Sequence, residues 1–302
     1  MLKSSVTSGS DKFKDGKIFV TRERGGLEKE YELHYRIHNP MNLSSQQAAP
    51  LVVLHGGPGV PSDYLYPLRD VIPYRSIIFF DQLGSGRSPV DACEDDLCLY
   101  SIDLAINDLE HLLKKLGVRK FHLYGQSFGG ILGFEFMKRI AEGSSIYHDR
   151  PDCLCAVLSS VPTDVQQVEG VADDLVSILL DEDNNESTVG ERFRLRHQCR
   201  TPEKPQPLVD AYNHAGTLWR GTTSIPDWKA IKPSDDASRM PSTMILRGEY
   251  DFVSDDCVKE WKEVYNHPFV RYKVLEGCSH HGLLEDSKSY GTLVQSYISE
   301  YD

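Results

Sequence analysis

The stretch most informative about the fold is Gly125-Gln126-Ser127-Phe128-Gly129-Gly130. It follows a short apolar run, residues 121–124 (FHLY), and precedes a stretch with helical character, residues 130–141. A serine within G-x-S-x-G, between a strand and a helix, is typical of a nucleophile elbow, a turn so sharp that bulky flanking side chains would clash. The turn lifts the Ser127 hydroxyl clear of the sheet, and the helix behind it directs N–H groups at charge that develops on a bound carbonyl. The same motif also occurs by chance in turns without chemistry, so the strand and the helix around it carry the prediction.

Short apolar runs alternate with helical stretches on both sides of this turn. Such alternation predicts βα units and a parallel sheet that helices cover on both faces. A hairpin is expected ahead of them, from strands at 17–22 and 31–37 joined by a Gly25-Gly26 turn, and residues 1–15 are expected to form a loose tail. The expected sheet strands are 51–54, 77–80, 121–124, 154–158, 244–246 and 272–275. The clearest helix is 102–116, and further helices are expected at 130–141, 254–265 and 287–299.

The alternation is lost between Val161 and Pro241. This stretch contains acidic helical patterns, a proline-rich break and an aromatic-bearing segment from Trp219 to Trp228. An insertion that leaves a sheet and returns to it predicts a mainly helical cap over the carboxyl edge of the strands, where ligands bind in open α/β folds. The sequence therefore predicts one core in two parts, residues 1–160 and 242–302, with a cap at 161–241.

Composition excludes several classes of protein. The chain has 302 residues, 40% of them hydrophobic and 26% charged, as in ordinary globular proteins. Its longest apolar run, from Cys153 to Leu158, is far shorter than the roughly 20 residues of a membrane-spanning helix. A net charge of −12 argues against a nucleic-acid partner. The first 16 residues lack the apolar core of a secretory signal, and the seven cysteines show no C-x-x-C or zinc-site spacing, so we expect reduced thiols, no metal and a cytoplasmic location.

A serine nucleophile needs a base, and the base needs an acid to orient it. Asp251 follows the run at 244–246, while its rivals Glu249, Asp255 and Asp256 lie before the turn or in the following helix. His280 and His281 both follow the run at 272–275. Adjacent side chains point in different directions, so only one histidine can meet Ser127, and periodicity does not choose between them.

The segment His55-Gly56-Gly57-Pro58-Gly59 follows the run at 51–54. Acyl transfer needs N–H donors directed at the oxyanion, and a glycine-rich loop at the end of a neighbouring strand can supply one. His55 is expected to brace this loop rather than to act as the base. Cys278, next to the histidine pair, is expected to be a packed thiol because it has no elbow of its own.

Taken together, these motifs resemble the α/β-hydrolase fold, and within it the proline iminopeptidase group of serine peptidases with their L-amino acid amidase relatives. The similarity runs from about Lys17 to the C-terminus. It implies a nucleophile at Ser127, an acid at Asp251, a base at His280 rather than His281, and an oxyanion hole made by the backbone N–H groups of Gly57 and Phe128. The motifs that carry it are HGGPG (55–59), DQLGSGRS (81–88), GQSFGG (125–130), GEYD (248–251) and GCSH (277–280).

The resemblance also implies carboxylates that hold a free α-amine, and here the sequence departs from it. One such carboxylate commonly follows the catalytic acid, where this chain has Phe252, and the cap segment 216–228 offers no glutamate for the second. Phe252 and Trp219 are instead the expected substrate contacts. Acidic cap residues that could replace the missing carboxylates are Asp173, Asp174, Glu186 and Glu191.

The function expected from this resemblance is that of a serine hydrolase that cleaves amide bonds without a cofactor. It would release an N-terminal, proline-like residue from short peptides or hydrolyse amino acid amides. One alternative is an esterase or lactonase acting on a neutral, apolar acyl compound, which Phe252 favours. A second is a hydrolase fold that binds a small molecule without catalysis. The oligomeric state is left open.

Overall fold

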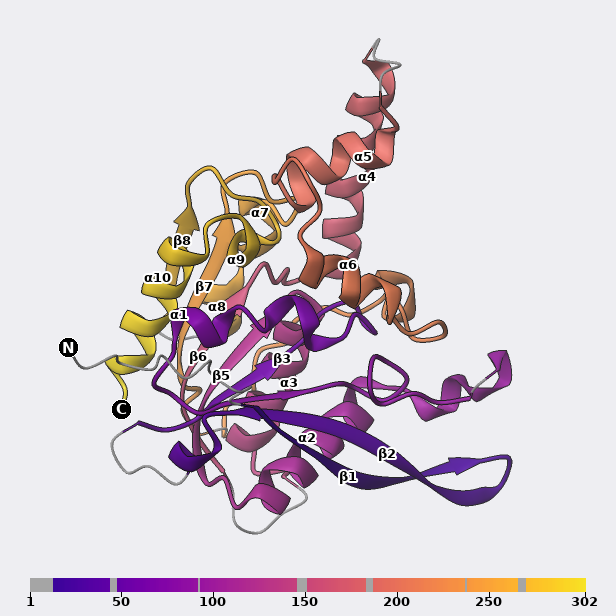
Figure 1. Cartoon of the computed structure of the whole chain (residues 1–302), viewed down its shortest axis with the longest axis vertical. Helices are drawn as coiled ribbons and strands as arrows, with labels where there is room; N and C mark the ends of the chain where they lie inside the picture. Colours follow the sequence, from indigo (N-terminus) through magenta and orange to yellow (C-terminus); the bar gives the residue numbers. More distant parts are fainter. Residues whose placement is uncertain are drawn as a thin grey trace, which may run out of the picture.

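The computed structural model describes residues 13–43, 48–91, 93–145, 151–182, 187–236, 238–265 and 270–302. Its centre is an eight-stranded sheet with the order β1-β2-β4-β3-β5-β6-β7-β8 (Figure 1). The six strands from β4 to β8 in this order are parallel, and β1 and β2 join them as an antiparallel hairpin. The strands are β1 (Phe13–Arg24), β2 (Leu27–His38), β3 (Leu51–Leu54), β4 (Ile77–Phe80), β5 (Lys120–Gln126), β6 (Asp152–Ser159), β7 (Ser242–Gly248) and β8 (Val270–Leu275).

The two faces of the sheet are covered by different helices. One apolar cluster joins alternate strand residues such as Val52 and Leu123 to α2 (Ile102–Leu116), α3 (Phe128–Ala141), α7 (Asp255–Val258) and α8 (Trp261–Tyr265). The other joins the alternating residues, such as Val53 and Tyr124, to α1 (Leu68–Val71), α9 (Gly282–Glu285) and α10 (Ser287–Ser299). This alternation follows from the two-residue period of a strand. The prediction of a mostly parallel sheet with helices on both faces is confirmed.

The chain leaves the sheet after β6 and returns to it at β7. The intervening residues form α4 (Val165–Asp181), α5 (Val189–Phe193), a π-helical turn (Arg194–Gln198), α6 (Gln206–Asn213) and a short 3-10 turn (Thr222–Ser224). In Figure 1, α4 and α5 project beyond the sheet as an arm, at the end opposite the turn of the β1–β2 hairpin. The described helices include none long and apolar enough to cross a membrane.

Two local expectations differ from the structure. Strand β1 begins at Phe13, so the end of the expected tail is already paired: Asp15 bonds to Arg36 of β2, while residues 1–12 lie outside the described ranges. The helix expected at 254–265 is split into α7 and α8. The hydroxyl of Tyr272 accepts the N–H of Lys262 and donates to the carbonyl of Val258, so it occupies the place of the i to i−4 bond that would have joined the two helices.

Candidate active site

Ser127 lies at the junction of β5 and α3. Its φ of 53° and ψ of −124° are unusual for a residue other than glycine, a conformation that costs on the order of 1–3 kcal/mol and persists only where the surroundings enforce it. The N–H of Ser127 donates to the carbonyl of Ser159 at 2.8 Å, which helps to hold this conformation. Two residues further on, the chain passes so close to β3 that any Cβ added at Gly129 would lie 2.1 Å from the carbonyl oxygen of Leu54. The backbone at Ser127 has the strained geometry of the elbow that the sequence predicts.

Asp251 and His280 form a buried pair. They come from the loops after β7 and β8, and the Nδ1 of His280 lies 2.9 Å from the Oδ1 of Asp251. The same Oδ1 accepts the N–H of Val253 at 2.9 Å, which holds the carboxylate in place. Both residues are only 6% exposed. Because Nδ1 contacts the carboxylate, Nε2 is the ring nitrogen of His280 that remains available to another group.

The rivals of Asp251 have other partners. Glu249 accepts the backbone N–H of Gly277, Asp255 forms an ion pair with Arg247, and Asp256 forms one with Lys259. Of the four carboxylates considered as the acid, only Asp251 contacts a histidine of the pair in the described structure.

His281 lies beside His280 with a ring-centroid distance of 5.3 Å, but it has a different environment. Burial, and then the neighbouring His280, hold the pKa of His281 well below its ordinary value, so its ring is neutral near pH 7. Its Nε2 has no hydrogen-bond partner among the described residues. The structure therefore gives the carboxylate contact to His280 and leaves His281 as a neutral group next to it.

The loop at residues 55–59 is held against the elbow by buried hydrogen bonds. His55, which is fully buried, accepts the N–H of Gln82 at its Nε2, so it braces the loop as expected. The hydroxyl of Tyr64 accepts the N–H of Gly56 at 2.8 Å and donates to the Oε1 of Gln126 at 2.6 Å. Gln126 in turn donates to the carbonyl of His280 at 3.4 Å. One chain of hydrogen bonds thus connects the segments that follow β3, β5 and β8.

Gly57 and Phe128 are the predicted oxyanion donors. Gly57 has a φ of 115°, a backbone conformation that favours glycine, and it lines the same cavity as Ser127. Phe128 is the first residue of α3, where a backbone N–H has no partner within the helix. Within the described chain, neither N–H donates to a protein group. Their role as an oxyanion hole stays a prediction.

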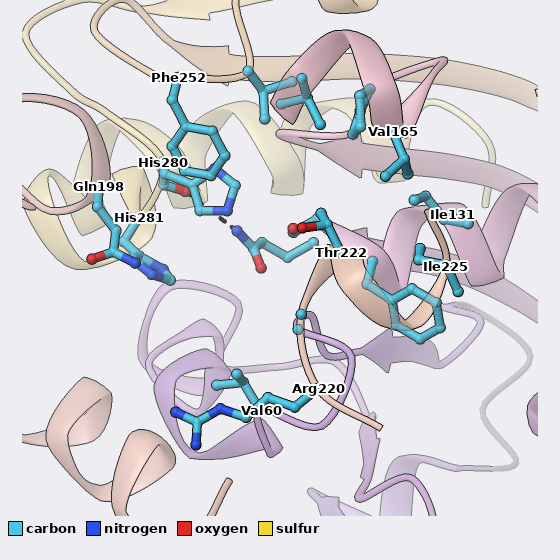
Figure 2. Close-up of a pocket in the computed structure, with 18 of the residues that line it drawn as sticks. Val60, Ile131, Val165, Gln198, Arg220, Thr222, Ile225, Phe252, His280 and His281 are labelled. Carbon is cyan, nitrogen blue, oxygen red and sulfur yellow. Dashed lines mark hydrogen bonds between the residues drawn. The ribbon is translucent and has the colours of Figure 1, made fainter. Parts of the chain in front are cut away.

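These groups surround a cavity of about 270 Å³. Its wall includes Ser127, His280 and His281 from the core and residues of α4, α6 and the 220–225 segment from the insertion. Figure 2 shows the ring of Phe252 lying over the imidazole of His280, and the ring centroids are 4.3 Å apart. The described residues that line the cavity include no aspartate or glutamate.

Of the two predicted substrate contacts, Phe252 and Trp219, the structure places only one in the cavity wall. Phe252 lines the cavity, but Trp219 does not: it packs behind the wall, stacked on Tyr100 and edge-on to Phe128. Trp219 can therefore support Phe128 but not touch a ligand in this cavity. Sequence reasoning missed Tyr64, Gln198, Tyr212 and Arg220, because no motif marks a residue that reaches the site only through the tertiary fold. Gln126 lies within the GQSFGG motif, but no role was predicted for it from the sequence.

The proposed replacement carboxylates of the cap are not in the cavity wall. Asp173 and Asp174 are exposed on α4, Glu191 forms an ion pair with Arg194, and Glu186 lies outside the described residues. Cys278 is buried, and burial raises the pKa of its thiol to about 11, so it is a packed, protonated thiol as expected. The seven cysteines are free, and no three His, Cys, Asp or Glu side chains of the described residues are grouped as metal ligands.

Comparison with known proteins agrees with the fold. Residues 51–289 match the family model described as "Alpha/beta hydrolase family". A relative named proline iminopeptidase, from Saccharolobus solfataricus, is 27% identical over 274 residues, which cover 83% of this chain and 84% of that protein. The crystal structure of VinJ superposes with a TM-score of 0.74 at 25% identity and covers 94% of this chain and 99% of that one. The structure of the Mycobacterium smegmatis proline iminopeptidase superposes with a TM-score of 0.73 at 22% identity, covering 94% and 98%, and at that identity it shows the fold alone.

Proposed function

The chain belongs to the alpha/beta hydrolase family, and on that premise we propose that it is a serine hydrolase that cleaves an amide bond. Its substrate in this proposal is a short peptide with an N-terminal, proline-like residue, or an amino acid amide. The observation that carries the proposal is the buried His280–Asp251 pair in the loops beside the strained Ser127, with Ser127 and His280 in the wall of one cavity. Relatives named proline iminopeptidase support the choice of an amide bond.

The reaction follows from the positions of these groups. Ser127 attacks the substrate carbonyl while the Nε2 of His280 accepts the hydroxyl proton, and Asp251 stabilises the imidazolium through Nδ1. The negative charge that develops on the carbonyl oxygen is stabilised by the N–H groups of Gly57 and Phe128. His280 then gives its proton to the leaving nitrogen, which departs and leaves an acyl group on Ser127. A water molecule then attacks the acyl carbon while His280 takes its proton, and His280 returns this proton to the Ser127 oxygen as the acid leaves.

An esterase is the second candidate, and one observation favours it. A carboxylate that would hold a free α-amine is missing from the described cavity wall, and Phe252 stands at the position where the related peptidases commonly carry one. An apolar ring beside a desolvated ammonium is at best a cation–π partner, worth on the order of 1–2 kcal/mol.

A substrate panel distinguishes the two candidates. Purified wild type and Ser127→Ala are assayed with proline and alanine 4-nitroanilides, proline amide, and 4-nitrophenyl acetate and butyrate. The proposal expects turnover of at least one amide that Ser127→Ala lacks. Turnover of esters with none of the amides would replace the amidase by the esterase, and no turnover of any compound by the folded wild type would contradict both.

A further inference from the structure

The cavity has two chemically different ends. Figure 2 shows Ile131, Val165 and Ile225 together on one side, and Gln198, His281 and the guanidinium of Arg220 on the other. The aliphatic end suits an apolar group. The polar end also includes the hydroxyl of Tyr212, which accepts a hydrogen bond from the Nε2 of Gln198 at 2.8 Å.

Arg220 is the cation at the polar end. No ion pair or side-chain hydrogen bond joins its guanidinium to any described residue. Burial raises the pKa of Tyr212 and the charge of Arg220 opposes that rise, so this charge acts on the polar end. By contrast, three arginines elsewhere in the insertion, Arg192, Arg194 and Arg196, each form an ion pair with a glutamate.

The charge of the cavity wall around Arg220 differs from the net charge of the whole molecule. The chain carries a net charge of −12, yet no carboxylate lines the described cavity wall. An unpaired guanidinium can bind a carboxylate through two parallel N–H bonds. The Nε2 of His281, which also has no partner among the described residues in a side chain only 7% exposed, is a second polar group available at this end.

The polar end is the side on which the leaving group lies. In the proposed mechanism, His280 gives its proton to the leaving atom, so the leaving group has to lie next to His280. The ring of His281 is 5.3 Å from that of His280, and its backbone N–H donates to the carbonyl of Gln198. The leaving group therefore faces Gln198, His281 and Arg220, and the acyl group faces the aliphatic end.

From this arrangement we propose that the site selects substrates whose leaving group carries a carboxylate, such as the C-terminal residue of a dipeptide, and that Arg220 binds this carboxylate. The inference rests on the proposed function, because it uses His280 to tell the leaving side from the acyl side. It names a substrate class that the Ser127, His280 and Asp251 set alone does not specify.

Two matched substrate pairs test the proposal. In the amide pair, proline 4-nitroanilide is compared with proline 3-carboxy-4-nitroanilide, and in the ester pair, phenyl acetate is compared with 4-acetoxybenzoate. Each pair differs by one carboxylate on the leaving group. The ratio of kcat/KM within a pair is measured for wild type and for Arg220→Gln, so the electronic effect of the carboxylate on the leaving group cancels between the two enzymes.

We expect the ratio of carboxylated to neutral substrate to be about tenfold higher in wild type than in Arg220→Gln, since a charge-assisted hydrogen bond at a partly exposed site contributes about this much. Lys204→Gln is the matched control, because Lys204 lies 5.7 Å from the ring of Tyr212 but outside the cavity wall. It removes the same charge from the same region and should leave the ratio at the wild-type value.

Two outcomes overturn the proposal. One is a ratio in Arg220→Gln within twofold of wild type, and the other is a fall in Lys204→Gln as large as that in Arg220→Gln. The ester pair separates this inference from the proposed function. If neither amide is cleaved, the amidase assignment fails, while the ester pair still reports whether Arg220 recognises the carboxylate.

Discussion

Two adjacent histidines differ in what they contact, and the proposed mechanism gives them different roles for this reason. His280 contacts Asp251, whereas His281 is a neutral ring without that contact. We predict that His280→Ala lowers kcat by on the order of 10⁴-fold or more. His281→Ala should keep kcat for a neutral substrate within about tenfold, because it removes no proton-transfer group. Equal losses in the two variants, with circular dichroism showing both folded, would mean that the base has been assigned wrongly.

The missing carboxylate in the cavity wall also leads to a prediction at the scale of single residues. A carboxylate beside a bound ammonium contributes roughly 1.5–3 kcal/mol, or about 10–150-fold in binding. Phe252 cannot supply this contact, and no described acidic residue lines the cavity. N-acetylation of proline 4-nitroanilide should therefore lower kcat/KM by less than about tenfold. A loss of roughly 1000-fold would show a strict amine site, and Asp173, Asp174, Glu186 and Glu191 would then be mutated in turn to find it.

At the scale of elements, Tyr64 connects the loops that follow β3, β5 and β8. Its hydroxyl accepts the N–H of Gly56 and donates to Gln126, which bonds to the carbonyl of His280. Tyr64→Phe keeps the ring but leaves the buried N–H of Gly56 unpaired, at a cost of about 1–3 kcal/mol. We predict that kcat falls by about tenfold or more and that the free energy of unfolding falls by a similar 1–3 kcal/mol.

A variant that lacks another buried tyrosine hydroxyl controls for stability alone. Tyr290 donates to Ser159 on the α10 face of the sheet, and its side chain does not line the cavity. Tyr290→Phe should lower the free energy of unfolding without the fall in kcat. If kcat falls in both variants in proportion to the loss in the free energy of unfolding, then Tyr64 acts through stability alone and does not position the site.

The sequence predicts elements well where one local pattern specifies them. Strands β3 and β4 and helices α2 and α10 have the expected bounds, because buried strands are short apolar runs and α2 has an apolar face, a Ser101 cap and a terminal Gly117. Helix α6 was not predicted, since Pro207 in its first turn was interpreted as part of a break. The α7–α8 break depends on Tyr272, a residue of β8 that no local pattern could connect with residues 258–262.

The residues of the candidate site were likewise predictable from the sequence only in part. Ser127, Asp251 and His280 could be named from motifs, because each follows a strand whose carboxyl end reaches the same sheet edge. Trp219 was expected at the substrate but packs behind Phe128. Arg220, its exposed neighbour in sequence, is the residue that lines the cavity, and no periodicity within this irregular segment tells which of two adjacent side chains borders the cavity.

For the molecule as a whole, buried histidines make stability depend on pH. Burial lowers the pKa of His55, His122 and His281 in the folded state. Below pH 6.5 the unfolded chain therefore binds protons that the folded chain does not, and the free energy of unfolding falls with decreasing pH by up to about 1.4 kcal/mol per pH unit for each histidine. We predict lower stability at pH 5.5 than at pH 7.5 in urea unfolding curves, with a smaller difference in His122→Gln. Equal or greater stability at pH 5.5 would contradict this account of the buried rings.

Whether Ser127 is a nucleophile activated by His280 is tested by treating the protein with a fluorophosphonate and measuring the mass of the intact protein and of its proteolytic peptides. A serine reacts quickly with this probe only when a base removes its proton during the attack. We predict that wild type gains the mass of one phosphonyl group and that the peptide containing Ser127 carries it. Ser127→Ala should gain none, and His280→Ala should react at least 100-fold more slowly. Labelling of Ser127→Ala at the wild-type rate, or no labelling of folded wild type, would contradict this role of Ser127.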